Sequence, residues 1–140
     1  MNMFSNEMSK FHRKVIVLYL LLLSAHVAHV FEEVWGRFWI LNEVGLGWFL
    51  TINWVLFCIP VTLFYFVLRK KRWAYNLSMV YSAFMALQGI FHNVATIVTG
   101  RYHDGLAGGF TGVFLLLIGA PLTYYLWKGR AELKSGPKLL

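Results

Sequence analysis

The chain has 140 residues, of which 59% are hydrophobic, 18% aromatic and only 14% charged. A soluble domain carries nearer a quarter charged residues, so this composition excludes an ordinary soluble globular protein and predicts a small polytopic membrane protein. The net charge of +7 does not indicate nucleic-acid binding, because the basic residues cluster at the ends of apolar runs, where they set topology and meet anionic headgroups. The single cysteine, Cys58, cannot form an intrachain disulfide.

Four segments are long enough to cross the ~30 Å hydrocarbon core as helices. They run from about 15 to 35, 47 to 68, 73 to 99 and 106 to 127. We therefore expect an all-α polytopic membrane protein, a four-transmembrane-helix bundle spanning residues 15–127. Residues 1–14 are expected to form a basic cytoplasmic lead-in, and residues 128–140 a polar cytoplasmic tail.

The segments between the helices carry aromatic and glycine signals. Residues 36–46 are predicted to be a short connection, with an interfacial belt made by Trp35, Phe38, Trp39 and Trp48. Pro60 is expected to kink the second helix. The fourth helix opens with Gly108, Gly109 and Gly112, which permit close contact with a neighbouring helix.

Charge bias predicts the orientation. The lead-in, the basic hairpin at residues 69–72 and the tail hold 11 of the 13 Lys and Arg residues, and the other two connections hold only Arg37 and Arg101. Basic residues favour the cytoplasmic side, so both termini are predicted to be cytoplasmic, and the bacterial inner (plasma) membrane is the expected location.

The first helix carries an unusual set of ionisable side chains. At about 100° per residue, His26, His29 and Glu33 fall within roughly 60° of one another, with Glu32 on the shoulder of that face. A charge at mid-helix in a membrane costs roughly 3 kcal/mol or more, so such groups indicate a functional site. The alternative is that the glutamates lie at the headgroup interface near Arg37, and for Glu32 the sequence does not decide between the two.

The orientation also predicts depth. The first and third helices both run outward, and 18 residues separate Val15 from Glu33 and Ala74 from His92, a rise of about 27 Å in each case. Glu33 and His92 should therefore lie at one level in the outer half of the bilayer, about 3–6 Å apart, in an outward-facing pocket. Other polar residues expected to line this pocket as ligand-binding groups are His26, Glu32, Asn53, Gln88, Asn93, Thr96, Tyr102 and Asp104.

The run His29-Val-Phe-Glu32-Glu33 matches the motif of the HXXEE family of small integral membrane proteins of unknown function, and the chain resembles that family over roughly residues 15–127. His92 corresponds to a third-span histidine, and residues 102–105 to a Tyr-x-Pro-Gly-like loop. Asp104 replaces the proline, and the nearest counterpart of the threonine that follows the loop is Thr111. The resemblance implies a fold and candidate site residues but no activity.

Three functions fit these residues. In the leading interpretation the pocket binds a lipophilic small molecule and converts it as an isomerase- or cyclase-like enzyme, with Glu33 as acid or base and His29 and His92 as partners. This resembles the logic of emopamil-binding-type sterol isomerases. A second interpretation is a zinc or non-haem iron site held by the same three residues.

The third interpretation is proton-coupled transport. The chain resembles the small multidrug exporters in having four expected spans and a glutamate in the first helix. The strong charge bias ranks it last, because those exporters have weak bias. Expected partners are the lipid bilayer and a lipophilic small molecule, without nucleic acid; the substrate and the formation of homo-oligomers stay open. For the histidines the alternative is interhelical hydrogen bonding alone, and Gln88, Asn93 and Thr96 are favoured as packing or supporting groups.

Overall fold

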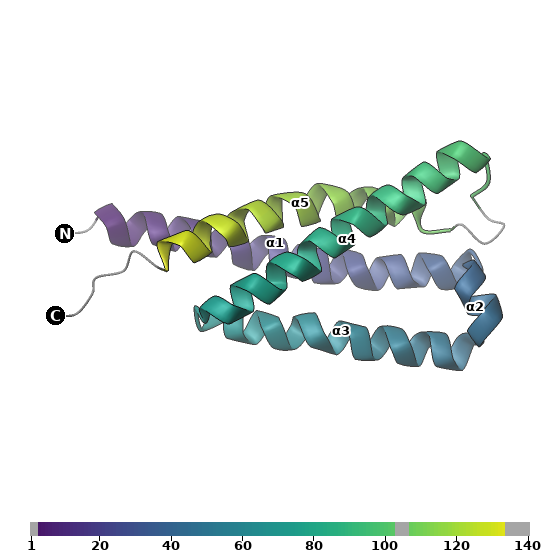
Figure 1. Cartoon of the computed structure of the whole chain (residues 1–140), viewed down its shortest axis with the longest axis horizontal. Helices are drawn as coiled ribbons and strands as arrows, with labels where there is room; N and C mark the ends of the chain where they lie inside the picture. Colours follow the sequence, from purple (N-terminus) through teal and green to yellow (C-terminus); the bar gives the residue numbers. More distant parts are fainter. Residues whose placement is uncertain (1–2, 103–106, 134–140) are drawn as a thin grey trace.

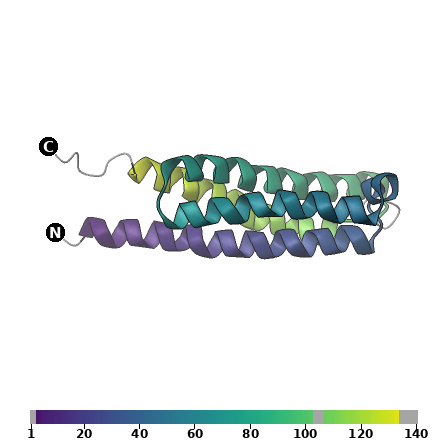
Figure 2. The same ribbon diagram turned by 90° about the horizontal axis from the view of Figure 1, so that it is seen from below.

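The computed structural model describes residues 3–102 and 107–133, and over these residues the chain is helical and contains no strand (Figure 1). The helices are α1 (Met3–Trp35), α2 (Trp39–Val44), α3 (Leu46–Leu68), α4 (Arg72–Thr99) and α5 (Gly109–Glu132). The long helices form a ring in which α5 packs against α1 and α4, and α3 packs against the same two helices from the other side. The beginning of α1 and the end of α5 lie at one end of the molecule, and α2 lies at the other (Figures 1 and 2).

Within the described part of the chain, three helical segments are long and apolar enough to cross a membrane: Phe11–Trp35, Leu46–Leu68 and Gly109–Glu132. The protein is therefore an all-helical protein with three candidate membrane spans. Helix α4 is longer than α3 and α5, but it contains more polar residues, among them Ser78, Ser82 and His92. A fourth span and the orientation of the termini remain predictions.

Three helix boundaries and one connection differ from the sequence-based expectation. Helix α1 begins at Met3, because residues 3–14 contain no glycine or proline that would interrupt a helix. The connection at residues 36–46 contains the six-residue helix α2, which was not predicted. Helix α5 begins at Gly109 and continues to Glu132, past the predicted end near residue 127.

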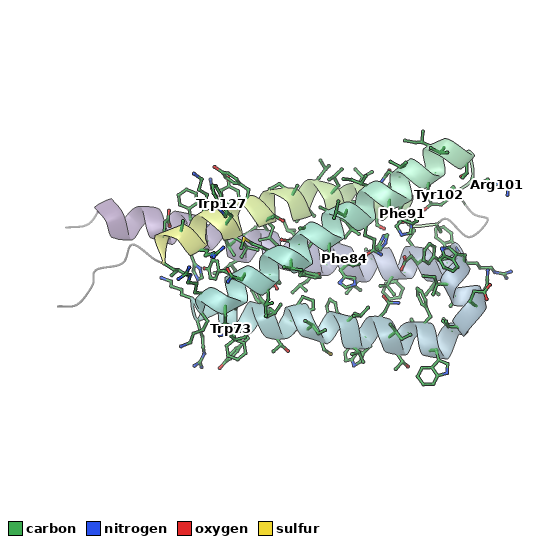
Figure 3. The ribbon with its side chains drawn as sticks, viewed as in Figure 1. Trp73, Phe84, Phe91, Arg101, Tyr102 and Trp127 are labelled. Atoms are coloured by element: carbon green, nitrogen blue, oxygen red, sulfur yellow. The ribbon has the colours of Figure 1, made fainter. Side chains whose placement is uncertain are left out.

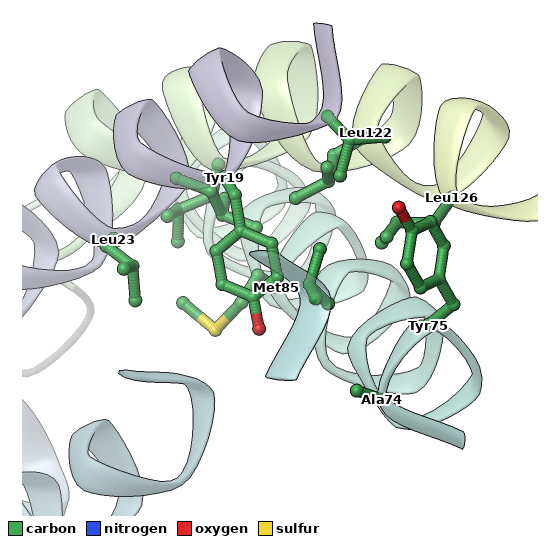
Figure 4. Close-up of a cluster of buried hydrophobic side chains, with 11 residues drawn as sticks. Tyr19, Leu23, Ala74, Tyr75, Met85, Leu122 and Leu126 are labelled. Carbon is green, nitrogen blue, oxygen red and sulfur yellow. The ribbon is translucent and has the colours of Figure 1, made fainter. Parts of the chain in front are cut away.

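The apolar core is a cluster of buried side chains that includes several from residues 15–23 of α1 (Figure 4). Tyr19, Leu22, Met85, Leu115 and Leu122 are almost completely buried there. The phenol of Tyr19 donates a hydrogen bond to the carbonyl of Pro60 at 3.1 Å and lies 3.0 Å from the Ser78 hydroxyl. This core joins α1, α4 and α5 with Val67 of α3, and the polar residues at positions 26–33 of α1 lie beyond it.

Glycines bring α4 and α5 into close contact beside the polar part of α1. A Cβ on Gly89 would lie 2.2 Å from the carbonyl oxygen of Gly112, and one on Gly112 would lie 3.2 Å from the Gly89 oxygen. Real Cβ atoms essentially never lie 2.2 Å from a backbone oxygen, so position 89 requires glycine, whereas a Cβ at position 112 would be crowded and would need its neighbours to shift slightly. The predicted role of Gly112 in close helix contact is confirmed, and Gly89 is its partner.

Candidate functional site

His29, Glu33 and His92 form a cluster between α1 and α4. The Glu33 Oε1 atom lies 3.5 Å from the Nε2 atom of His29 and 3.4 Å from the Nε2 atom of His92. All three side chains are buried, with relative exposures of 0%, 3% and 1%. The expectation that Glu33 and His92 lie at one level, within about 3–6 Å, is confirmed. The two imidazole rings meet edge to face, with their centroids 4.8 Å apart.

The neighbouring carboxylate, Glu32, has a different environment. It accepts hydrogen bonds from the backbone N–H groups of Phe110 and Thr111, at 3.0 and 2.7 Å, and from the hydroxyls of Tyr102 and Thr111. Glu32 is only 7% exposed, so its carboxylate faces the interior of the bundle, and its depth relative to the headgroups remains a prediction. The position of this carboxylate has a physical reason. The first N–H groups of α5 have no acceptors within the helix, so a carboxylate can accept their hydrogen bonds. Its negative charge is also favourable at the positive end of the helix dipole.

Tyr102 is held as a proton donor at this contact. Burial and the nearby Glu32 carboxylate raise the pKa of Tyr102 to about 12, so its phenol keeps its proton at neutral pH. Tyr102 lies at the end of the molecule that carries α2, whereas Trp73 and Trp127 lie at the opposite end (Figure 3). Tyr102 was predicted to bind a ligand, but its hydroxyl donates to Glu32, and it does not line either of the two cavities near the cluster.

Thr111 links Glu32 to His29. Its hydroxyl has one hydrogen, which it donates to Glu32, because an ionised carboxylate can only accept. The Thr111 oxygen therefore accepts from His29, whose Nδ1 atom lies 2.8 Å away. The Nδ1 atom of His29 thus carries a hydrogen, and its Nε2 atom is directed toward Glu33, with the Gln88 side-chain nitrogen 3.2 Å away.

A lid of small and aromatic residues covers the cluster on the side of α2. The ring of Phe38 is 6% exposed and packs on His92, with the ring centroids 5.0 Å apart. Phe38 therefore does not belong to an interfacial belt, whereas Trp35, Trp39 and Trp48 are exposed, as predicted. A Cβ on Gly108 would lie 2.6 Å from the Nδ1 atom of His92, so only glycine fits over that ring, and its φ of 126° also favours glycine.

One cavity adjoins the cluster, and a second cavity adjoins the first. The smaller, of about 250 Å³, lies between α1, α3 and α4 and is lined by both polar and apolar residues, including His29, Glu33 and Gln88. The larger, of about 450 Å³, lies between α1 and α3 and is lined mainly by apolar side chains. Both cavities are lined by His26, Val30 and Asn53, so they adjoin each other at these residues.

The remaining predicted site residues divide into two groups. His26 and Asn53 line both cavities, with the Nδ1 atom of His26 at 3.1 Å from the hydroxyl of Tyr81. Asn93 and Thr96 bond to carbonyls of their own helix and face the glycines at the start of α5, and neither lines the cavities. Asp104 lies outside the described residues.

Sequence reasoning missed several residues around the cluster. Thr111 appeared only as the nearest counterpart of a family threonine, Phe38 was assigned to the membrane interface, and Tyr81 was not considered. Thr111 is the third residue of α5, where a hydroxyl can bond near the free N–H groups, but the helix was expected to begin near residue 106, so this signal was not recognised. For Phe38 no local signal existed, because its burial depends on the turn between α1 and α2.

Comparison with known proteins gave no relatives: no family model matches the chain, and neither a curated protein nor a solved structure matches it. The fold and the geometry above therefore carry the functional argument.

Proposed function

We propose that this chain is a four-span integral membrane protein of the HXXEE type, with both termini in the cytoplasm of a bacterial cell. Its pocket binds a lipophilic small molecule, and its His/Glu cluster converts that molecule by acid–base chemistry. The observation that carries this proposal is that His29 and Glu33 line a cavity that adjoins a larger apolar one.

The distribution of side chains on α4 supports a fourth span. Its polar residues Ser78, Ser82 and His92 are buried against other helices. Its outward residues are apolar, with Val80 68% exposed and Leu87 64% exposed. A helix with this pattern presents apolar side chains to lipid and polar side chains to the interior, as expected for a span in a functional bundle.

The contacts of Glu33 suit acid–base chemistry. Its polar neighbours among the described side chains are two histidine Nε2 atoms at 3.4 and 3.5 Å, longer than an ordinary N–H···O hydrogen bond. Glu33 is therefore less constrained than Glu32 and lines the cavity. It can exchange a proton with a bound molecule, and the Nε2 atom of His29, which carries no hydrogen while Nδ1 does, can accept a proton in the same step.

The test is purification in native-lipid nanodiscs, followed by mass spectrometry of co-purifying lipophilic molecules and by incubation with the molecule found. Glu33→Gln keeps the shape of the side chain and removes its charge, so we expect this variant to fold and bind the molecule but not to convert it. Glu43→Gln is the matched control, because Glu43 is exposed on α2. Equal turnover in both variants would contradict the acid–base role.

The geometry also favours a second candidate, a divalent metal site. Ligand atoms about 2.0–2.2 Å from a tetrahedral zinc ion are about 3.3–3.6 Å apart. The separations of 3.4 and 3.5 Å between Glu33 and the two histidines match this spacing, and the three ligand atoms lie within 4.8 Å of one another. The hydrogen bond from His29 Nδ1 to Thr111 leaves Nε2 as the ligating atom, as metal-bound histidines require.

Elemental analysis separates the two candidates. A metal site predicts stoichiometric zinc or iron in the purified wild type and in Glu43→Gln, and its loss in Glu33→Gln. Loss of the ion should also lower stability, because bound metal stabilises the folded state. Absence of metal from protein that was purified without chelators and then supplied with zinc would leave the acid–base candidate alone.

A further inference from the structure

Helix α3 stands away from the rest of the molecule along the stretch beside the cluster. Its buried residues are Phe49, Pro60, Leu63 and Val67, and none of residues 50–59, all of which the structure describes, is buried. This same stretch contributes residues to both cavities. The cavities therefore result from the gap that α3 leaves beside α1 and α4.

The rims of both cavities consist of apolar side chains on the outer surface. At the larger cavity Phe31 of α1 is 72% exposed and Trp54 of α3 is 67% exposed. At the smaller cavity Ile59 of α3 is 53% exposed and Phe84 of α4 is 61% exposed. In a membrane these surfaces contact hydrocarbon, so the cavities open sideways into the bilayer.

At the end of the molecule that carries α2, toward which the pocket was expected to open, described residues cover the cluster. Phe38 and Gly108 pack directly on His92, and a Cβ on Gly36 would lie 1.9 Å from the Cβ of Ala107. Gly36 and Ala107 are both buried. A water-soluble molecule that came from this end would need to displace these packed residues to reach Glu33, whereas a molecule dissolved in the bilayer would not.

We propose that the ligand is a membrane-dissolved amphiphile that enters sideways between α1 and α3. Its hydrocarbon chain occupies the larger cavity, and its hydrogen-bonding end passes Asn53 to reach Glu33. The distribution of polar side chains supports this placement. The larger cavity is lined mainly by apolar side chains, and the polar residues His26 and Asn53 lie where it adjoins the smaller cavity. This inference rests on the pocket of the proposed function, but not on any conversion there.

The probe is a sixteen-carbon fatty alcohol that carries a photoreactive diazirine in its chain, added to the full-length protein in nanodiscs. We expect cross-links to concentrate on residues 27–34 of α1 and 46–57 of α3. Leu50→Trp fills the rim of the larger cavity at a position that is 44% exposed, so folding should tolerate it. Excluding about two methylene groups from apolar contact should lower cross-linking at these segments about tenfold.

The matched control is Leu117→Trp on α5, a residue that is 63% exposed and lines neither cavity. Val30→Trp, at the junction of the two cavities, is a second test of the same route. Cross-linking spread over all lipid-facing helices, or unchanged in both cavity variants, would overturn the inference. Equal competition by butanol, which lacks the long chain, would overturn sideways entry of an amphiphile while leaving a ligand pocket.

Cross-linking at α1 and α3 that persists in protein with no turnover of any co-purified molecule would support the entry route and contradict the catalytic part of the proposed function. The two proposals therefore fail separately.

Discussion

The link between Glu32 and His29 can be broken with one isosteric change, Thr111→Val. This change keeps the shape of the side chain but removes one donor to Glu32 and the acceptor of the His29 Nδ1 hydrogen at 2.8 Å. Leaving a buried donor unpaired costs about 1–3 kcal/mol in general, while interhelical hydrogen bonds in membrane proteins average about 0.6 and reach about 1.7 kcal/mol. Because two bonds are lost at a buried site, we expect the free energy of unfolding to fall by about 1–3 kcal/mol.

Reversible unfolding with sodium dodecyl sulfate in mixed micelles measures this loss. Thr62→Val is the matched control, because the Thr62 hydroxyl is exposed and bonds only to the Cys58 carbonyl of its own helix. Nitrogen NMR of labelled histidine gives a second measurement: the Nδ1–H form of His29 should dominate in the wild type and in Thr111→Ser, and should be lost in Thr111→Val. If Thr111→Val matches Thr62→Val in stability and leaves His29 unchanged, the assignment of the Nδ1 hydrogen is wrong.

Two further predictions concern packing and topology. Gly89→Ala should lower the free energy of unfolding by about 1–3 kcal/mol, because its Cβ would lie 2.2 Å from a backbone oxygen of α5. The control Gly47→Ala, whose Cβ would have nothing within 4 Å, should leave stability unchanged or raise it slightly. Equal stabilities of the two variants would contradict the close contact of α4 and α5. In a variant lacking Cys58, a cysteine at Arg101 should react with a membrane-impermeant maleimide in intact cells and one at Lys70 should not, and labelling at Lys70 would refute the predicted orientation.

The convergence of Glu33 and His92 could be predicted because it depends on regular quantities. Helical rise and the bias of basic residues place both side chains at one depth, and the 3.6-residue period places His29 and Glu33 on one face. The distance of 3.4 Å between Glu33 and His92 falls within the expected range of about 3–6 Å. Long, periodic helices are the part of a fold that sequence patterns describe best.

The environment of Glu32 could not be predicted for a physical reason. It depends on where α5 begins, and that start is set by Gly108, whose φ is 126°, and not by any apolar period. The sequence placed the start near residue 106, so the free N–H groups of Phe110 and Thr111 were not recognised. The burial of Phe38 depends in the same way on a tight turn after α1.

The paired glutamates of the motif acquire separate roles from one geometric fact. Consecutive residues on a helix point about 100° apart, so adjacent carboxylates necessarily face different surroundings. Glu32 faces the start of α5 and is surrounded by four donors, whereas Glu33 faces a cavity and two histidines. A carboxylate whose acceptor sites are filled stabilises structure, and one with free acceptor sites beside a cavity is available for chemistry. His29 connects the two, because its Nδ1 atom bonds to the Glu32 network through Thr111 while its Nε2 atom faces Glu33. The histidine and both glutamates thus form one unit, in which Glu32, through Thr111, orients the histidine that faces Glu33.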